Sequence, residues 1–96
     1  MNFDMVGYNG HSGLDDICIS WDRNSNKDQS SFLIELLKEY LPHLNGKHIA
    51  CNYGCSDHTS WMSNKYPATM ATECDLFENP NWHRQTDIVK TLDLSF

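Results

Sequence analysis

The segment CNYGCSDHTSW, residues 51–61, constrains the fold of this chain more than any other stretch. Its two cysteines, Cys51 and Cys55, are close enough in sequence for a tight loop to bring them together. Residues that favour the start of a helix follow immediately. We therefore expect a conformationally constrained loop that holds Tyr53 in one orientation next to the N-terminus of a short helix.

The two cysteines by themselves allow three interpretations. They can form a disulfide, which requires their Cα atoms to lie within roughly 4.4 to 6.8 Å of each other. They can bind a structural zinc ion together with His58 and Cys74, although the strong zinc signature has a second close pair of cysteines and Cys74 stands alone. They can also be reduced and buried.

Hydrophobic periodicity predicts an α/β arrangement. Apolar residues at three- and four-residue steps predict a helix over residues 30–41, which Asp28 or Ser30 can cap and Pro42 ends. Alternation at period two predicts a strand over residues 16–22. The other expected elements are strands at 2–6, 47–51 and 66–72, and a short helix at 56–64 that Ser56 or Asp57 can cap.

The composition excludes several classes of protein. The chain has 96 residues, of which 40% are hydrophobic and 21% charged, so it is one small globular domain or part of a larger one. Its formal net charge is −6 and its basic residues are scattered, which argues against a nucleic-acid partner. The sequence contains neither a membrane-spanning apolar run nor a signal-peptide pattern.

Three side chains far apart in sequence are candidates for chemistry at one site. Asp4 would lie at or just beyond the C-terminal end of a strand, where ligands gather at the edge of α/β sheets, although it could instead accept hydrogen bonds from the loop at residues 7–10. His83 follows Trp82, which can fix the imidazole for a metal, or it is an ordinary loop histidine. The phenol of Tyr53 can donate to an oxyanion, or it is a surface aromatic.

The motifs NFDMVGY, EYLP, CNYGCSDHTSW, KYPATM and NPNWHRQTD occur in this order over nearly the whole chain. Together they resemble the C-terminal part of the bacterial leucyl aminopeptidases, which are secreted exopeptidases with two co-catalytic zinc ions. The resemblance implies a three-layer zinc-exopeptidase α/β sandwich with a mixed sheet. Residues 1–96 would then form the C-terminal portion of the catalytic domain, without its N-terminal half.

The same resemblance implies roles for individual residues. Asp4 would bind one zinc ion and His83 the other, and Tyr53 would hydrogen-bond the tetrahedral intermediate. The family also builds an apolar pocket for the first side chain of the peptide. Its counterparts here are Met5, Cys51, Cys55, Met70, Trp82 and one of Leu76 or Phe77.

For the cysteines, the resemblance implies a disulfide between Cys51 and Cys55, and we expect Cys18 and Cys74 to stay free. Thr72 stands where an aromatic pocket residue is expected in the family. The general base and the remaining zinc ligands of the family have no counterpart in residues 1–96.

The function implied is that of a zinc metallo-aminopeptidase that releases N-terminal, preferably hydrophobic, residues from peptides outside the cytoplasm, in the extracellular space or the periplasm. Its partners would be peptide substrates and a missing N-terminal half, with no nucleic acid and no membrane. Two alternatives stay open at this point. The chain could be a truncated non-catalytic fragment or interaction module, or a small structural-zinc module.

Overall fold

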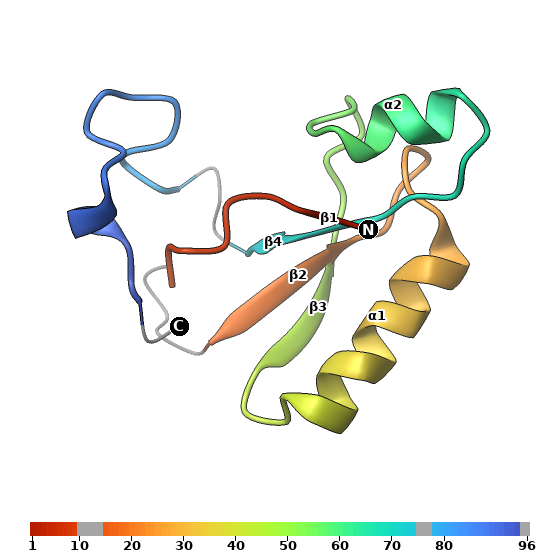
Figure 1. Ribbon diagram of the computed structural model, residues 1–96, viewed down its shortest axis with the longest axis horizontal. Coiled ribbons are helices and arrows are strands. Elements are labelled where there is room, and N and C mark those ends of the chain that lie inside the picture. Colours follow the sequence, from red (N-terminus) through yellow and green to blue (C-terminus); the bar gives the residue numbers. More distant parts are fainter. Residues whose placement is uncertain (10–14, 75–77, 95–96) are drawn as a thin grey trace.

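A mixed four-stranded sheet organises the part of the chain that the computed structural model describes, which is residues 1–9, 15–74 and 78–94 (Figure 1). The strands are β1 (Asn2–Phe3), β2 (Asp16–Ser20), β3 (Asn45–Ile49) and β4 (Met70–Glu73). Their order is β1-β4-β2-β3, with β4 antiparallel to β2 and the other two pairs parallel. The predicted mixed α/β fold is confirmed, although β3 begins at Asn45 instead of residue 47 and β4 at Met70 instead of residue 66.

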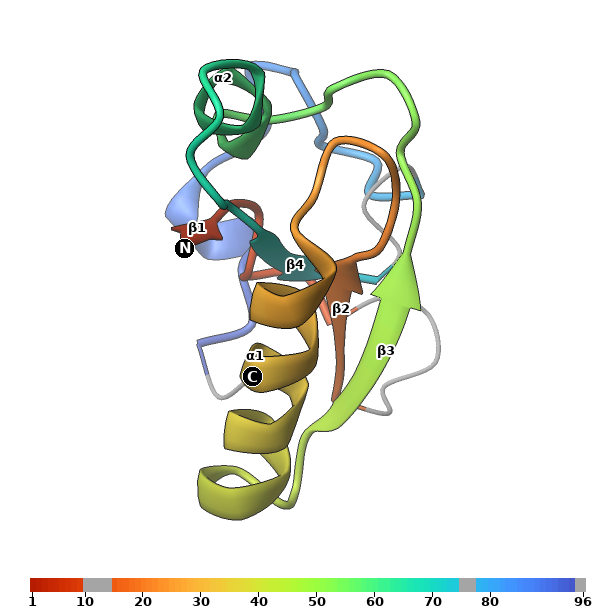
Figure 2. The same cartoon turned by 90° about the vertical axis from the view of Figure 1, so that its right-hand side faces the viewer.

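Helix α1 (Lys27–Tyr40) lies along one face of the sheet, next to β2 and β3 (Figure 2). Its periodic apolar stripe packs on that face, where Ile19, Leu33 and Ala71 form the buried core. The helix ends just before Pro42, as predicted, because the residue before a proline avoids helical backbone angles. Since Ala71 faces α1, its neighbours in β4 point to the opposite face of the sheet.

The predicted N-terminal cap of α1 was wrong. The helix begins earlier than residue 30, and Asn26 caps it by accepting the N–H of Gln29 at 3.0 Å. Asp28 lies within the first turn, and Ser30 is fully buried and donates from its hydroxyl to the carbonyl of Ser20 at 2.7 Å. Ser30 therefore joins the helix to the sheet instead of starting the helix.

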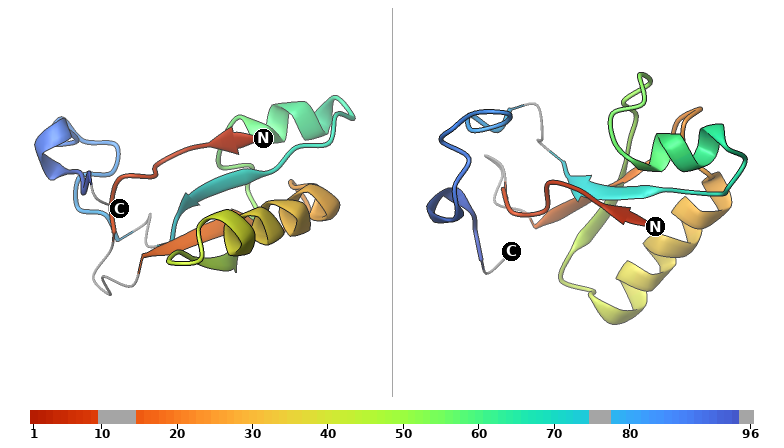
Figure 3. Two further views of the ribbon diagram at one scale, coloured as in Figure 1. Left: turned by 60° about the horizontal axis from the view of Figure 1, so that its bottom comes forward. Right: turned by 45° about the horizontal axis from the view of Figure 1, so that its top comes forward.

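Two shorter helical segments complete the described chain. Helix α2 (His58–Ser63) lies beyond the C-terminal ends of β2 and β3, and the 3-10 turn η1 (Val89–Thr91) belongs to the segment at 78–94 (Figure 3). That segment lies beside residues 4–9, and the N–H of Asp93 donates to the carbonyl of Gly7 at 2.7 Å. None of the helices in these parts of the chain is long and apolar enough to cross a membrane.

The cysteines form two disulfides, Cys51–Cys55 and Cys18–Cys74. The expectation that Cys18 and Cys74 stay free was therefore wrong. Cys18 lies on β2 and Cys74 directly follows β4, and antiparallel pairing of these strands brings the two Cα atoms to 4.9 Å. Disulfided sulfurs are not thiolate ligands, so the structural-zinc alternative loses its donors.

Removing the Cys18–Cys74 disulfide should destabilise the protein more than removing Cys51–Cys55. The sequence separations are 56 and 4 residues, and the loop-entropy relation then gives losses of about 4 and about 2 kcal/mol in the free energy of unfolding. Paired Cys→Ser variants in urea unfolding would measure both losses. Alkylation without reductant should label no cysteine, whereas two labelled thiols would contradict the Cys18–Cys74 bond.

Candidate active site

A pocket of about 350 Å3 lies on the face of the sheet opposite α1. We call it the Asp4–His83 pocket. Residues from the end of β1, from β4, from the cysteine loop at 51–55 and from the segment at 78–94 line it. These residues are Asp4, Met5, Tyr53, Cys55, Met70, Thr72, Trp82, His83 and Asp87.

The pocket brings together most of the residues that the sequence predicted for the site. The predicted ligands Asp4 and His83 line it together with Tyr53 and the predicted pocket residues Met5, Cys55, Met70 and Trp82. Cys51 is not among its lining residues, and Leu76 and Phe77 lie outside the described residues. Asp87, which lies just before η1, also lines the pocket and was not predicted from the sequence.

Asp4 is held at the end of β1 by both its backbone and its side chain. Its N–H donates to the carbonyl of Ala71 at 3.1 Å, which continues the pairing with β4. Its carboxylate accepts the hydroxyl of Ser56 at 2.6 Å, and the same hydroxyl oxygen accepts from the side chain of Asn2 at 2.9 Å. The sequence assigned Ser56 to capping α2, which was wrong, because its hydroxyl orients Asp4 instead.

The N-terminus of α2 has no side-chain cap. Asp57 occupies the capping position, but its carboxylate makes no capping hydrogen bond, so this expectation was wrong as well. The backbone carbonyl of Ser56 accepts the N–H of Thr59 at 3.1 Å and closes the first turn instead. The backbone carbonyl of Ser56 therefore accepts a hydrogen bond from the first turn of α2, while its hydroxyl donates to the carboxylate of Asp4.

His83 is exposed on a turn whose backbone is unusual for a side-chain-bearing residue. Its φ is 54°, in the left-handed region, and its ring stacks on Trp82 with the centroids 4.3 Å apart. The predicted packing of Trp82 against the imidazole is thus confirmed. The turn is set by Asn79, whose carbonyl accepts the N–H of Trp82 at 3.1 Å.

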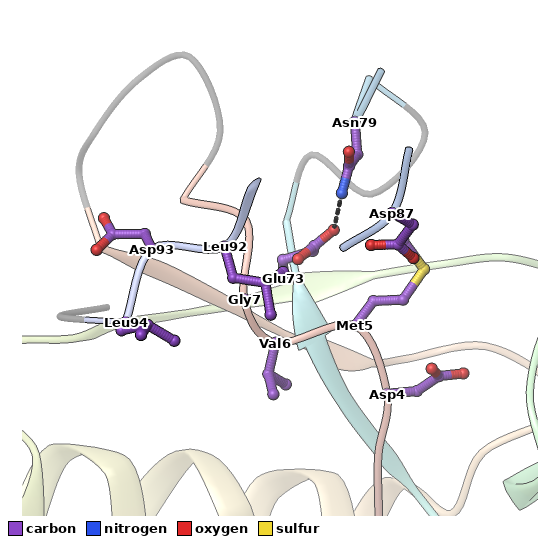
Figure 4. Close-up of a pocket in the computed structure, with 10 residues that line it drawn as sticks. All are labelled: Asp4, Met5, Val6, Gly7, Glu73, Asn79, Asp87, Leu92, Asp93 and Leu94. Carbon is purple, nitrogen blue, oxygen red and sulfur yellow. Dashed lines mark hydrogen bonds between the residues drawn. The ribbon is translucent and has the colours of Figure 1, made fainter. Parts of the chain in front are cut away.

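Glu73 joins the two segments that carry Asp4 and His83. Its side chain accepts the amide of Asn79 at 3.1 Å (Figure 4). It also accepts the N–H of Tyr8 at 2.7 Å, and the N–H of Glu73 itself donates to the carbonyl of Met5 at 2.7 Å. Burial raises the pKa of its carboxyl, with the hydrogen bonds to Asn79 and Tyr8 opposing that rise. One interpretation of the sequence was that Asp4 accepts a hydrogen bond from the loop that follows it. In the structure Glu73 accepts that hydrogen bond, from the N–H of Tyr8.

A second hollow of about 560 Å3 adjoins the Asp4–His83 pocket and shares Asp4, Met5 and Asp87 with it (Figure 4). Leu92 and Leu94 give it apolar walls, while the carboxyl groups of Glu73 and Asp93 make it acidic. Glu73 was not among the site residues predicted from the sequence. Its only signal was a charged residue directly after the apolar run at 68–72.

Tyr53 sits at the tip of the loop that the Cys51–Cys55 disulfide closes. Its side chain is 61% exposed and lines the pocket. Gly54 has a φ of 71°, and a Cβ there would come within 2.9 Å of the Thr59 side chain, so only glycine fits between the loop and α2. The loop therefore lies directly against the helix, as the sequence predicts.

His58 is buried, with 1% of its surface exposed. Burial lowers the pKa of its imidazole, although the carboxylates of Asp22, Asp4 and Asp57 oppose the shift. The ring is therefore neutral at pH 7. Its Nδ1 has no hydrogen-bond partner within the described part of the chain. His58 is the first residue of α2 and does not line the pocket.

Asp4 and His83 supply the donor atoms that zinc prefers, a carboxylate oxygen and an imidazole nitrogen. Within residues 1–9, 15–74 and 78–94, however, no group of three or more His, Cys, Asp or Glu side chains could hold a metal ion. Two such donors facing one hollow fit part of a metal centre, and the described residues do not complete one.

A carboxylate, an imidazole and a phenol around a partly apolar hollow on a mixed α/β sheet suit a metallopeptidase. The family model described as "Peptidase family M28" matches residues 1–96, and the chain belongs to this family.

Its relatives include fungal and bacterial proteins. The chain is 31% identical over 96 residues to a probable leucine aminopeptidase of Arthroderma benhamiae, an alignment that covers 97% of this chain and 25% of that protein. It is 42% identical over 69 residues to leucine aminopeptidase 1 of Emericella nidulans, covering 70% of this chain and 17% of that one.

Solved structures agree with this assignment. The chain is similar to LapA of Legionella pneumophila with a TM-score of 0.84 and 31% identity, over 96% of this chain and 25% of that chain. For LapB of the same organism the TM-score is 0.82 at 25% identity, over 99% of this chain and 27% of that one. The chain thus spans about a quarter of the length of the relatives it matches.

Proposed function

We propose that residues 1–96 form the part of a two-zinc aminopeptidase that carries one ligand for each zinc ion, an oxyanion donor and most of the pocket for the first side chain of the peptide. One observation carries this proposal, namely that Asp4, Tyr53 and His83 line the same pocket although they are far apart in sequence. The reaction would be hydrolysis of the first peptide bond, which releases the N-terminal residue.

Asp4 and His83 would each hold one zinc ion of the complete enzyme. Bound zinc would polarise the peptide carbonyl and lower the pKa of a water molecule. The hydroxyl of Ser56 fixes the rotamer of the Asp4 carboxylate by donating to it, and Trp82 fixes the ring plane of His83 by stacking. The general base that accepts the proton of the attacking water would lie outside residues 1–96.

Tyr53 would donate its phenolic O–H to the oxyanion that develops on the peptide carbonyl. A donor of this kind stabilises the transition state more than the substrate, because the negative charge appears only as the water attacks. The disulfide and the tight packing of Gly54 on Thr59 support the loop that presents the phenol. This arrangement gives the exposed Tyr53 a defined place at the rim of the pocket.

The apolar walls favour a hydrophobic first residue such as leucine. Met5, Met70 and Trp82 provide flexible and aromatic surface, and the Cys55 end of the disulfide lies beside them. Thr72 adds a hydroxyl-bearing side chain where the family places an aromatic residue. The two disulfides are typical of proteins that fold in an oxidising compartment, and they support an extracellular or periplasmic location.

A chimera tests this proposal. In it, residues 1–96 replace the matching segment of Legionella LapA, whose fold they share. The purified chimera should hydrolyse leucine p-nitroanilide in a zinc-dependent manner. Its kcat/KM should be at least about tenfold higher for leucine than for alanine, since each methylene in an apolar pocket contributes on that scale. A folded chimera without hydrolysis would reject the catalytic proposal and favour the non-catalytic alternative.

A further inference from the structure

Asp22 lies in a turn almost thirty residues before the cysteine loop at 51–55 and accepts hydrogen bonds from its backbone. Its side chain is buried, and one carboxylate oxygen, Oδ2, accepts the N–H groups of Cys51 at 2.9 Å and Asn52 at 3.0 Å. Its other oxygen, Oδ1, accepts the N–H of Asn24 at 2.8 Å. The carboxylate thus fixes the two consecutive peptide groups that precede Asn52, the residue next to Tyr53.

The turn that carries Asp22 is itself fixed. The N–H of Asp22 donates to the hydroxyl of Ser25 at 3.0 Å, and the N–H of Ser25 donates back to the carbonyl of Asp22 at 3.3 Å. The turn directly follows β2 and leads into α1, so it rests on the rigid centre of the fold. Because the turn fixes the carboxylate of Asp22, the carboxylate can fix the position of the cysteine loop at 51–55.

Arg23 holds the same stretch of loop through a second contact. Its guanidinium donates from Nη2 to the carbonyl of Asn52 at 3.0 Å, while Asp22 accepts the N–H of Asn52. Asn52 has a φ of 62°, in the sparsely populated left-handed region, which asparagine adopts more readily than most residues. Two neighbouring residues of one turn therefore hold Asn52, the residue directly before Tyr53, in this sparsely populated conformation.

The charge state of Asp22 suits this clamp. Burial would raise the pKa of its carboxyl, but the N–H groups of Asn52, Asn24 and Cys51 outweigh that effect, and the pKa lies below its usual value. The carboxylate is therefore ionised at neutral pH, and charge-assisted hydrogen bonds to N–H groups are the strong kind. The buried imidazole of His58 lies close enough to Asp22 to interact with its charge.

The disulfide alone does not define the path of the loop. It joins the two ends of the loop, Cys51 and Cys55, but the peptide groups on both sides of Asn52 lie between them and could still rotate. Tyr53 is 61% exposed, so burial of its own side chain contributes little to fixing its backbone. The hydrogen bonds with Asp22 and Arg23 hold the peptide groups on both sides of Asn52 directly.

We propose that Asp22 and Arg23 are positioning residues for Tyr53, which set the direction in which the phenol points into the Asp4–His83 pocket. This inference rests on the proposed function, because it requires Tyr53 to donate to the oxyanion. The two residues act through the loop backbone and do not touch the substrate.

A double-mutant cycle in the LapA chimera tests the inference. Asp22→Asn should lower kcat about tenfold with little change in KM, the scale found when groups that orient an active site are altered. Arg23→Met should lower kcat a few-fold, and Arg23→Lys should restore part of the loss. In a Tyr53→Phe background both substitutions should have almost no further effect on kcat, because the group they position is gone.

Matched controls separate positioning from general stability. Asp16→Asn makes the same chemical change at the other end of β2, where Asp16 pairs with Lys47. Lys27→Met removes an exposed cation next to Trp21 that does not contact the loop. Both should leave kcat unchanged. Arg23 is exposed, so Arg23→Met tests the clamp even where Asp22→Asn impairs folding.

Hydrogen exchange at the Cys51 and Asn52 amides provides a readout that does not depend on activity. Both amides should exchange faster in Asp22→Asn than in Asp16→Asn. The inference would be overturned if Asp22→Asn and Arg23→Met lowered kcat by the same factors with Tyr53 intact and in the Tyr53→Phe background. A Tyr53→Phe substitution without effect on kcat would instead reject the proposed role of Tyr53, so the two failures are distinguishable.

Discussion

Tyr53→Phe should lower kcat of the LapA chimera by roughly 100- to 1,000-fold while KM changes little. The substitution removes only the phenolic O–H, and loss of one oxyanion donor costs on the order of 3 to 4 kcal/mol in transition-state stabilisation. Because Tyr53 is 61% exposed, the free energy of unfolding should hardly change. Steady-state kinetics with leucine p-nitroanilide and urea unfolding would measure both quantities.

Tyr66→Phe is the matched control for this substitution. Tyr66 is 62% exposed and packs edge-on against Trp61, away from the Asp4–His83 pocket. Its variant should keep the full kcat. A change in Tyr53→Phe that is confined to KM would show that the phenol holds substrate without stabilising the oxyanion.

Residues 1–96 expressed alone should show no zinc-dependent turnover, whereas the chimera should be active. Asp4 and His83 would serve different zinc ions, so each ion would keep one protein ligand from this chain where catalytic zinc has roughly three. One ligand holds a metal weakly, and a weakly bound ion would still lack the general base. Leucine p-nitroanilide hydrolysis and zinc titration by calorimetry would test both points.

Turnover by residues 1–96 alone would contradict this expectation if Asp4→Ala or His83→Ala abolished it. A dimer, or further ligands such as His58 or Glu73, would then have to complete the site. In the structure both of these side chains are 1% exposed, and Glu73 is engaged with Tyr8 and Asn79. Because His58 and Glu73 are buried, we do not expect them to act as additional zinc ligands.

The elements with strong local signals were predictable from the sequence. The apolar repeat of α1 reflects the burial of one stripe of the helix, and the alternation of β2 reflects the burial of its side chains in the sheet. A local sequence pattern is enough to predict either element. The stop of α1 before Pro42 is likewise a local backbone effect. The capping of α1 by Asn26 was missed because Ser30, a typical capping residue, is used to join the helix to the sheet.

Features that depend on strand pairing were not predictable. The Cys18–Cys74 bond follows from the antiparallel register of β2 and β4, and nothing local to either cysteine reports that register. The same holds for Glu73 and Asp22, whose carboxylates accept backbone N–H groups far away in the sequence.

For the candidate site, the resemblance to the aminopeptidase family selected Asp4, Tyr53 and His83. The local patterns alone left a simpler interpretation open for each of them. The structure places all three around one hollow, and their roles in catalysis stay predictions.

Zinc content of the chimera shows whether Asp4 and His83 are zinc ligands without requiring turnover. We expect about two zinc ions per molecule, falling to about one in Asp4→Ala and to about one in His83→Ala, with Asp16→Asn as the unchanged control. Atomic emission after dialysis would measure these numbers. Two zinc ions retained in both variants would show that neither residue is a ligand and would contradict the account.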